Sequence, residues 1–83
     1  MPRDEPSASR LAAFGATLRQ IRLAAGMTQL ELGNAAGMGR TYINELETGG
    51  RNPTYLALWQ LATALDVSPR SFFPYVEPSD SKG

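Results

Sequence analysis

The segment from Gly39 to Pro53 gathers arginine, asparagine, glutamate, threonine and tyrosine side chains around two apolar residues, Ile43 and Leu46, in an 83-residue chain of zero formal net charge. Helical residues three apart share a face, so Ile43 and Leu46 would point inward together and send the polar side chains outward. Arginine can pair with guanine, asparagine with adenine, and threonine with a base or a thymine methyl group. The segment therefore has the chemistry to read base edges. The residues expected on its outward face are Arg40, Thr41, Asn44, Glu45 and Thr48.

Glu45 fits this chemistry less well than its neighbours. A carboxylate is repelled by phosphate groups, unless it accepts a hydrogen bond from cytosine or orients a neighbouring arginine. Polar and charged residues also cover any solvated helix surface. The residues alone leave that plainer interpretation equally open.

Three further side chains could hold a phosphate backbone. Gln29 is predicted at the start of a helix, where its amide and the free backbone N–H groups could bind phosphate together. Arg51 and Asn52 follow two glycines, in a loop that lets an arginine approach a sugar-phosphate strand closely. Each has a plainer alternative, because an exposed glutamine often has no special role and a surface turn needs glycine and asparagine for conformational reasons.

Three helices are expected to position these side chains. Apolar residues recurring at steps of three and four predict a helix over about Ser9–Ala25. Thr28 and Glu31 have the spacing of a capping box, which starts a second helix. The short interruption at Gly37–Gly39 forces the third helix, about Arg40–Thr48, to cross the second one steeply. This is a helix-turn-helix arrangement, whose second helix can enter the major groove.

Two more helices complete the expected fold. Thr54 caps a fourth helix with a leucine-rich buried stripe, and Ser68 with Pro69 opens a short fifth helix that ends near Phe73. With no strand pattern and no internal repeat, the sequence predicts an all-α domain of five helices. We expect residues 1–9 to form a flexible N-terminal arm, residues 10–73 the helix-turn-helix domain, and residues 74–83 a disordered polar tail.

The composition argues against several kinds of chemistry. The chain has no cysteine and no histidine, which removes disulfides and the usual zinc and acid-base ligands. We therefore predict no enzyme activity, no metal, no cofactor and no small-molecule effector site. No segment has the ~20 apolar residues of a membrane span, and the N-terminus lacks the apolar core of a secretory signal, so we expect a cytoplasmic protein. Residues 10–73 hold six arginines and four acids, a weak basic bias that permits a DNA partner without demanding one.

The C-terminal half carries more large apolar side chains than so small a domain easily covers by itself. This surface favours a homodimer. The alternative is that two or three of these residues complete the core, and for Trp59 both interpretations stay open. The residues expected at the dimer interface are Trp59, Phe72, Phe73 and Tyr75.

The stretch MTQLELGNAAGMGRTYINELETGGRNPT, followed by LWQLATALDVSPRSFF, resembles the phage-repressor and Cro-like helix-turn-helix family of the XRE type over about residues 14–73. The shared features are a glutamine after a threonine cap, glycine in the turn, Ile-x-x-Leu-Glu in the recognition helix, and Asn-Pro after it. The sequence RTYI with the RNP turn looks most like the controller proteins of restriction-modification systems. Other short repressors share both features.

The resemblance implies a role for each residue of the candidate site. Arg40, Thr41, Asn44 and Glu45 would face the groove, while an ion pair would join the first and third helices. Gly33 and Gly39 stand where the family usually has alanine and a capping serine, and each should loosen a helix by a fraction of a kcal/mol to about 1 kcal/mol. The residues implied to hold the DNA backbone are Gln29, Tyr42, Arg51 and Asn52, with Thr48 beside them, and those implied to form the ion pair are Arg22 and Glu47.

These observations favour a sequence-specific DNA-binding transcriptional regulator, such as a repressor, in a prokaryotic cytoplasm. By resemblance it would act as a homodimer on a near-palindromic operator, with two recognition helices about 34 Å apart. The alternative is a protein-interaction module, such as an antitoxin or anti-repressor, that keeps the fold and binds another protein through the surface around Trp59 and Phe72. Zero net charge and Glu45 favour this alternative.

Overall fold

The computed structural model describes residues 4–74, which contain four α-helices and one 3₁₀ turn and no strand. Residues 75–83 of the predicted tail (74–83), including Tyr75, lie outside the described residues, as do residues 1–3. An all-α fold is therefore what the described part of the chain adopts. Its elements are α1 (Asp4–Ala24), α2 (Gln29–Ala36), α3 (Arg40–Glu47), α4 (Tyr55–Leu65) and the 3₁₀ turn η1 (Pro69–Phe72).

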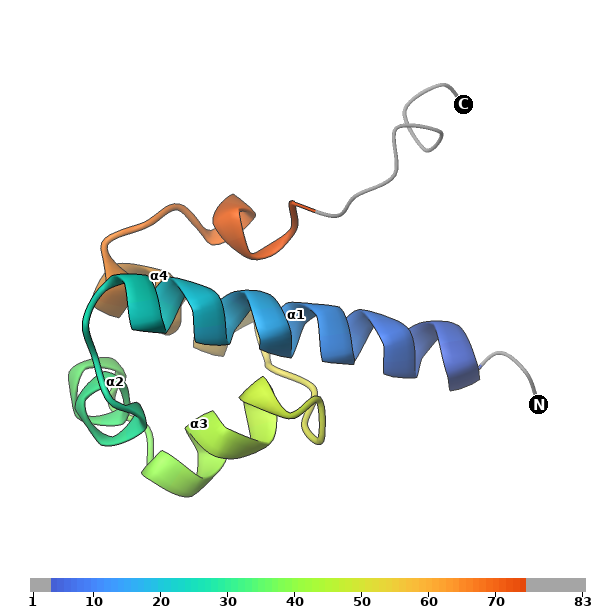
Figure 1. Cartoon of the computed structure of the whole chain (residues 1–83), viewed down its shortest axis with the longest axis horizontal. Coiled ribbons are helices and arrows are strands. Elements are labelled where there is room, and N and C mark those ends of the chain that lie inside the picture. Colours follow the sequence, from blue (N-terminus) through green and yellow to red (C-terminus); the bar gives the residue numbers. More distant parts are fainter. Residues whose placement is uncertain (1–3, 75–83) are drawn as a thin grey trace.

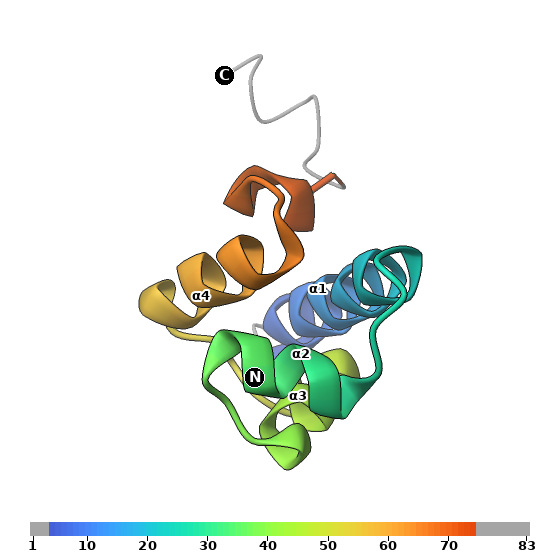
Figure 2. The ribbon, with the colours of Figure 1, turned by 90° about the vertical axis from the view of Figure 1, so that its left-hand side faces the viewer.

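The helices surround one core. Helix α1 runs along the length of the molecule, with α3 on one side of it and η1 on the opposite side (Figure 1). Helices α2 and α3 lie next to each other at one edge (Figure 2), and α2 also contacts α4. Contacts of α1 with both α3 and η1 join the two sides. This packing holds α3 at the surface of the molecule.

Two predicted helices differ from the observed ones. Helix α1 begins at Asp4, before the predicted start at about Ser9. The prediction missed this first part because its residues lack the apolar spacing that indicated the rest of the helix. The predicted fifth helix is a single 3₁₀ turn, with Ser71 N donating to Ser68 O at 2.9 Å and Phe73 N to Arg70 O at 3.1 Å. These bonds span three residues rather than four. The expected count of five α-helices is corrected to four within residues 4–74.

The helix starts predicted from capping residues are present. Thr28 Oγ1 accepts from Glu31 N at 3.0 Å, and Glu31 Oε1 accepts from Thr28 N at 2.9 Å, so the capping box is complete. Thr54 Oγ1 accepts from Ala57 N at 3.0 Å at the start of α4. Gly37 ends α2 with φ 75°, the left-handed conformation that the turn before α3 requires.

The core anchors α3 from beneath. Ile43 and Leu46 are fully buried, as their spacing predicted. Phe72, expected at a dimer interface, is also fully buried, with its ring edge-on to Phe14 at a centroid distance of 5.5 Å. Its ring completes the core of the chain itself and cannot reach a partner without unpacking, so we remove Phe72 from the expected interface.

Two buried glycines allow α3 and the turn before it to approach their neighbours closely. A Cβ at Gly15 of α1 would lie 2.4 Å from Leu46 O, and a Cβ at Gly33 of α2 would lie 2.5 Å from Met38 O. Both distances are shorter than real Cβ atoms adopt to a non-bonded atom. Gly33 therefore allows the turn between α2 and α3 to pack closely, a role that its low helix propensity did not reveal.

Candidate nucleic-acid interface

The outer face of α3 is polar and open to solvent. Arg40, Thr41, Asn44 and Thr48 are exposed, and Glu45 is half-buried. The N-cap residue Gly39 provides no side-chain hydrogen bond. The face therefore depends on contacts with α1 and α2 for its orientation.

A buried ion pair fixes α3 against α1. Arg22 Nε donates to Glu47 Oε2 at 2.6 Å and Arg22 Nη2 to Glu47 Oε1 at 3.1 Å, which is the pair that the resemblance implies. Arg22 Nη1 also donates to Met27 O at 2.7 Å, in the turn before α2. The hydrogen bond with Glu47 raises the pKa of Arg22 above its ordinary value and outweighs burial, which lowers it. The pair thus holds α1, α3 and the turn before α2 together.

Gln29 bridges α2 and α3. Its Nε2 donates to Glu47 Oε1 at 3.0 Å and to Asn44 Oδ1 at 3.2 Å. Both amide hydrogens are then engaged within the chain. A phosphate at Gln29 would have to displace one of these bonds or use the backbone N–H groups at the start of α2.

Arg51 lies against α3 rather than in an open loop. Arg51 Nη2 and Nε donate to Glu45 Oε1 at 2.6 and 3.0 Å, and the guanidinium carbon lies 5.3 Å from the centre of the Tyr42 ring. The loop can return to α3 because Gly49 adopts φ 81°, a conformation that favours glycine. Glu45, Tyr42 and Arg51 are therefore one cluster at the end of the recognition helix.

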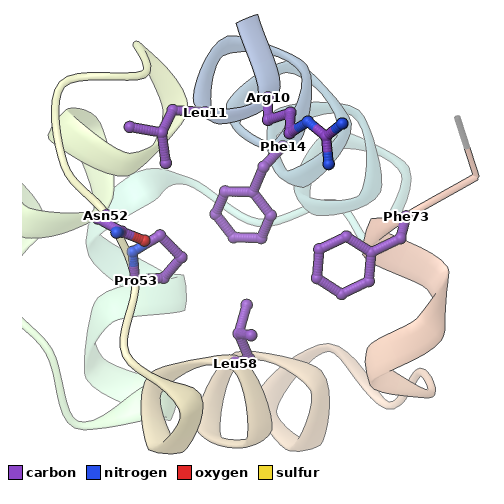
Figure 3. A pocket seen from close by; sticks show the side chains of 7 residues that line it. All are labelled: Arg10, Leu11, Phe14, Asn52, Pro53, Leu58 and Phe73. Atoms are coloured by element: carbon purple, nitrogen blue, oxygen red, sulfur yellow. The ribbon is translucent and has the colours of Figure 1, made fainter. Parts of the chain in front are cut away.

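Asn52 is exposed beside a mostly apolar cavity of about 280 Å³ between α1, the loop after α3, and α4. Figure 3 shows Phe14, Leu58 and Phe73 around this space, with Arg10 and Asn52 at its sides. Arg10 was not predicted as part of the site. Asn52 belongs to the loop that carries Arg51, whereas Arg10 comes from α1 on another side of the cavity.

Sequence reasoning missed Gly15 and the two side-chain bridges. A glycine between Phe14 and Leu18 in an apolar stripe is the signal that could have indicated a close helix contact at Gly15. The sequence left open that Glu45 orients a neighbouring arginine but did not indicate which arginine, and nothing in it indicates that Gln29 contacts Asn44.

The residues expected at the dimer interface differ in their exposure to solvent. Trp59 is 46% exposed and Phe73 36% exposed, whereas Phe72 is buried. Two neighbours of Trp59 on α4, Tyr55 and Leu56, are 76% and 64% exposed, and the Tyr55 ring lies edge-on to Trp59. The outer face of α4 is therefore apolar over its first half, whereas the exposed residues further along, Gln60 and Thr63, are polar.

The described residues contain neither a candidate membrane span nor a group of side chains suited to a metal ion. No helix in residues 4–74 is long and apolar enough to cross a membrane. That part of the chain also holds no cluster of acidic residues suited to a metal ion. The polar face of α3 remains the principal candidate site.

The geometry is that of a helix-turn-helix: α2 and α3 are joined by a short turn at Gly37, and α3 is exposed on its outer face. Residues 18–72 match the helix-turn-helix family (HTH_3), and the chain belongs to this XRE-type family of DNA-binding transcriptional regulators.

Three relatives illustrate the family. The chain is 41% identical over 54 residues to the uncharacterized HTH-type transcriptional regulator y4dJ of Sinorhizobium fredii. The matched region covers 65% of this chain and 70% of the relative. It is 35% identical over 63 residues to control protein C.BamHI of Bacillus amyloliquefaciens, covering 75% and 78%. The crystal structure of the restriction-modification controller protein C.AhdI from Aeromonas hydrophila is similar with a TM-score of 0.77 and 40% identity, over 78% of this chain and 98% of that one. These relatives are regulators rather than enzymes.

Proposed function

We propose that this protein binds a specific DNA site in the cytoplasm and regulates transcription there, without enzymatic activity. The observation that carries the proposal is the exposed polar face of α3, held from beneath by Ile43 and Leu46 and from the side by the Arg22–Glu47 pair. Arg40 lies in the first turn of α3, where a recognition helix contacts base edges. Arg51 and Asn52, just after α3, would hold the phosphate backbone together with Tyr42 and Thr48.

We also propose that it acts as a homodimer on a near-palindromic operator. The apolar face of α4, formed by Tyr55, Leu56 and Trp59, is the surface that a second copy would cover, and Phe73 would contribute at its edge. Figure 2 places α4 and α3 on different sides of the molecule, so a partner at α4 leaves α3 open to DNA. Two recognition helices about 34 Å apart would then read two half-sites.

Binding-site selection from a random DNA pool tests the proposal, followed by affinity measurements on the selected site. Arg40→Ala should cost roughly 1 to 3 kcal/mol and relax selection at one base pair, because bidentate guanine contacts carry that discrimination. Arg51→Ala should weaken binding almost uniformly and reduce the salt slope by about one. Absence of binding to any sequence at low salt would refute the proposal.

A protein-interaction module is the second candidate, favoured by the Glu45–Arg51 ion pair. This pair removes one positive charge from the face that DNA would approach, and the apolar face of α4 could receive a different protein. Co-purification of a stoichiometric partner, together with absence of salt-dependent DNA affinity, would favour this candidate over the regulator.

A further inference from the structure

A chain of hydrogen bonds runs from the buried ion pair to the surface of α3. The Glu47 side chain is only 2% exposed and accepts from Arg22 with both oxygens. Gln29 Nε2 donates to Glu47 Oε1 at 3.0 Å and to Asn44 Oδ1 at 3.2 Å. Asn44 is exposed, so the chain ends at a side chain on the candidate DNA-binding face.

The buried carboxylate of Glu47 determines which group donates and which accepts in each of these hydrogen bonds. Glu47 is a carboxylate paired with a guanidinium, and a carboxylate can only accept hydrogen bonds. Gln29 must therefore turn its NH₂ group, not its oxygen, toward Glu47. The second hydrogen of that NH₂ group is donated to Asn44, which must accept it with its carbonyl oxygen. The NH₂ group of Asn44 is then the part of its amide that remains to donate to another molecule.

We propose that Asn44 is a specificity-determining residue that presents a hydrogen-bond donor and reads an acceptor on a base edge. In the major groove the acceptors that a lone donor can use without facing a neighbouring base donor are guanine O6 and N7 and thymine O4, whereas adenine N7 lies beside the N6–H₂ donor. The inference rests on the proposed function, because it needs α3 in that groove. Gln29 acts through Asn44 and is a positioning residue in this scheme.

The same geometry disfavours the other two bases. Cytosine presents its own donor, N4–H₂, so the NH₂ group of Asn44 would meet it donor to donor. The bidentate contact between asparagine and adenine uses the oxygen and the nitrogen of the amide together. Because Gln29 holds the Asn44 oxygen, the adenine contact that asparagine usually makes is weakened here.

Binding-site selection with sequencing of the bound pool tests this inference in the wild-type protein, two variants and a control. Asn44→Ala identifies the base pair that Asn44 contacts, as the position where selection is lost. At that position the wild-type protein should prefer guanine or thymine by about tenfold over cytosine and adenine. Gln29→Leu keeps the asparagine but frees its amide to turn, so adenine should rise to within about twofold of the preferred base.

Gln20→Leu, the same change at an exposed glutamine of α1, is the matched control and should leave the preference at that base pair unchanged. Gln29→Met replaces the leucine variant if circular dichroism shows that the latter does not fold. A wild-type preference for adenine or cytosine at that position would overturn the proposal, as would an unchanged preference after the Gln29 substitution. Uniform weakening by Asn44→Ala at all sequences would also overturn it, because that result identifies a phosphate contact.

Failure of the proposed function has a different result. In that case the wild-type protein shows no salt-dependent binding to any DNA, and both ideas fall together. If the wild-type protein selects a defined site but the preferred base at the Asn44 position is not guanine or thymine, the proposed regulator function is supported. The proposed base contact of Asn44 is then refuted.

Discussion

Glu45 is the residue whose surroundings differ most from its expected role. It was expected among the base-reading side chains, yet its Oε1 atom lies 2.6 Å from Arg51 Nη2, with the two side chains 38% and 51% exposed. Exposed ion pairs contribute only about 0 to 1 kcal/mol to stability. The pair therefore matters less for the fold than for the charge that Arg51 can offer to a phosphate.

Glu45→Gln removes that neutralising charge. We predict that the affinity for non-specific DNA rises roughly threefold at 0.1 M salt, and that the slope of log affinity against log salt becomes steeper by less than about one, because Arg51 then faces phosphate without its neutralising partner. Fluorescence anisotropy at several salt concentrations measures both. Glu31→Gln is the matched control, since it removes one carboxylate that does not contact Arg51 and glutamine still completes a capping box. An unchanged slope for the Glu45 variant would show that Arg51 is not held back by its partner.

At the residue scale, the sequence was sufficient to predict which residues of α3 face inward, because the spacing of Ile43 and Leu46 determines it. The sequence was not sufficient to predict the Glu45–Arg51 contact, which depends on how the loop turns back at Gly49. The contact between Gln29 and Asn44 likewise depends on the angle between α2 and α3. The path of the loop and the angle between the helices are both set by packing of the whole molecule. The spacing of residues in the sequence therefore does not reveal these contacts.

At the scale of elements, the Arg22–Glu47 pair joins α1 to α3. We predict that Arg22→Met costs about 3 kcal/mol in the free energy of unfolding, because it leaves a buried carboxylate without its cation. The double variant Arg22→Met/Glu47→Leu should recover much of this loss, since no buried charge remains. Urea unfolding of the wild-type protein, the two single variants and the double variant gives the coupling energy. Additive effects of the two single changes would contradict the role of the pair.

Gly33, inside α2, and Gly39, at the start of α3, are predicted to respond in opposite ways when a side chain is added. Gly39 is an N-cap at φ −73° with no side-chain hydrogen bond and nothing within 4 Å of an added Cβ. Gly39→Ser should therefore stabilise the protein by a few tenths to about 1 kcal/mol. Gly33→Ala should destabilise it by about 1 kcal/mol or more, because the added Cβ meets Met38 O. Thermal unfolding distinguishes the signs, and stabilisation by Gly33→Ala would contradict the close approach.

The boundaries of elements were predictable where capping residues mark them. Thr28 with Glu31 and Thr54 start α2 and α4 as predicted, because a cap satisfies free backbone N–H groups locally. The 3₁₀ form of η1 was not predictable, since a proline in the first turn suits an α-helix as well. The start of α1 at Asp4 was missed because its first residues carry no apolar stripe.

At the scale of the whole molecule, the proposed dimer depends on the apolar face of α4. We predict that Trp59→Glu shifts the protein from dimer to monomer in sedimentation velocity at tens of micromolar, because the charge would be buried at the interface. Its affinity for a two-half-site DNA should fall at least about tenfold, through loss of bivalent binding, while affinity for one half-site is retained. Leu23→Glu is the control, because Leu23 is 50% exposed, like Trp59, but lies on α1. A wild-type protein that sediments only as a monomer would contradict the dimer.

The most direct test of the central claim is methylation interference on the selected DNA site. Methylation of guanine N7 blocks an acceptor in the major groove that arginine and asparagine donors use. If the outer face of α3 lies against base edges, methylation of one or two guanines in each half-site should abolish binding, at positions about 34 Å apart, and Arg40→Ala should lose sensitivity at one of them. Tight binding that tolerates N7 methylation throughout the site would contradict the account.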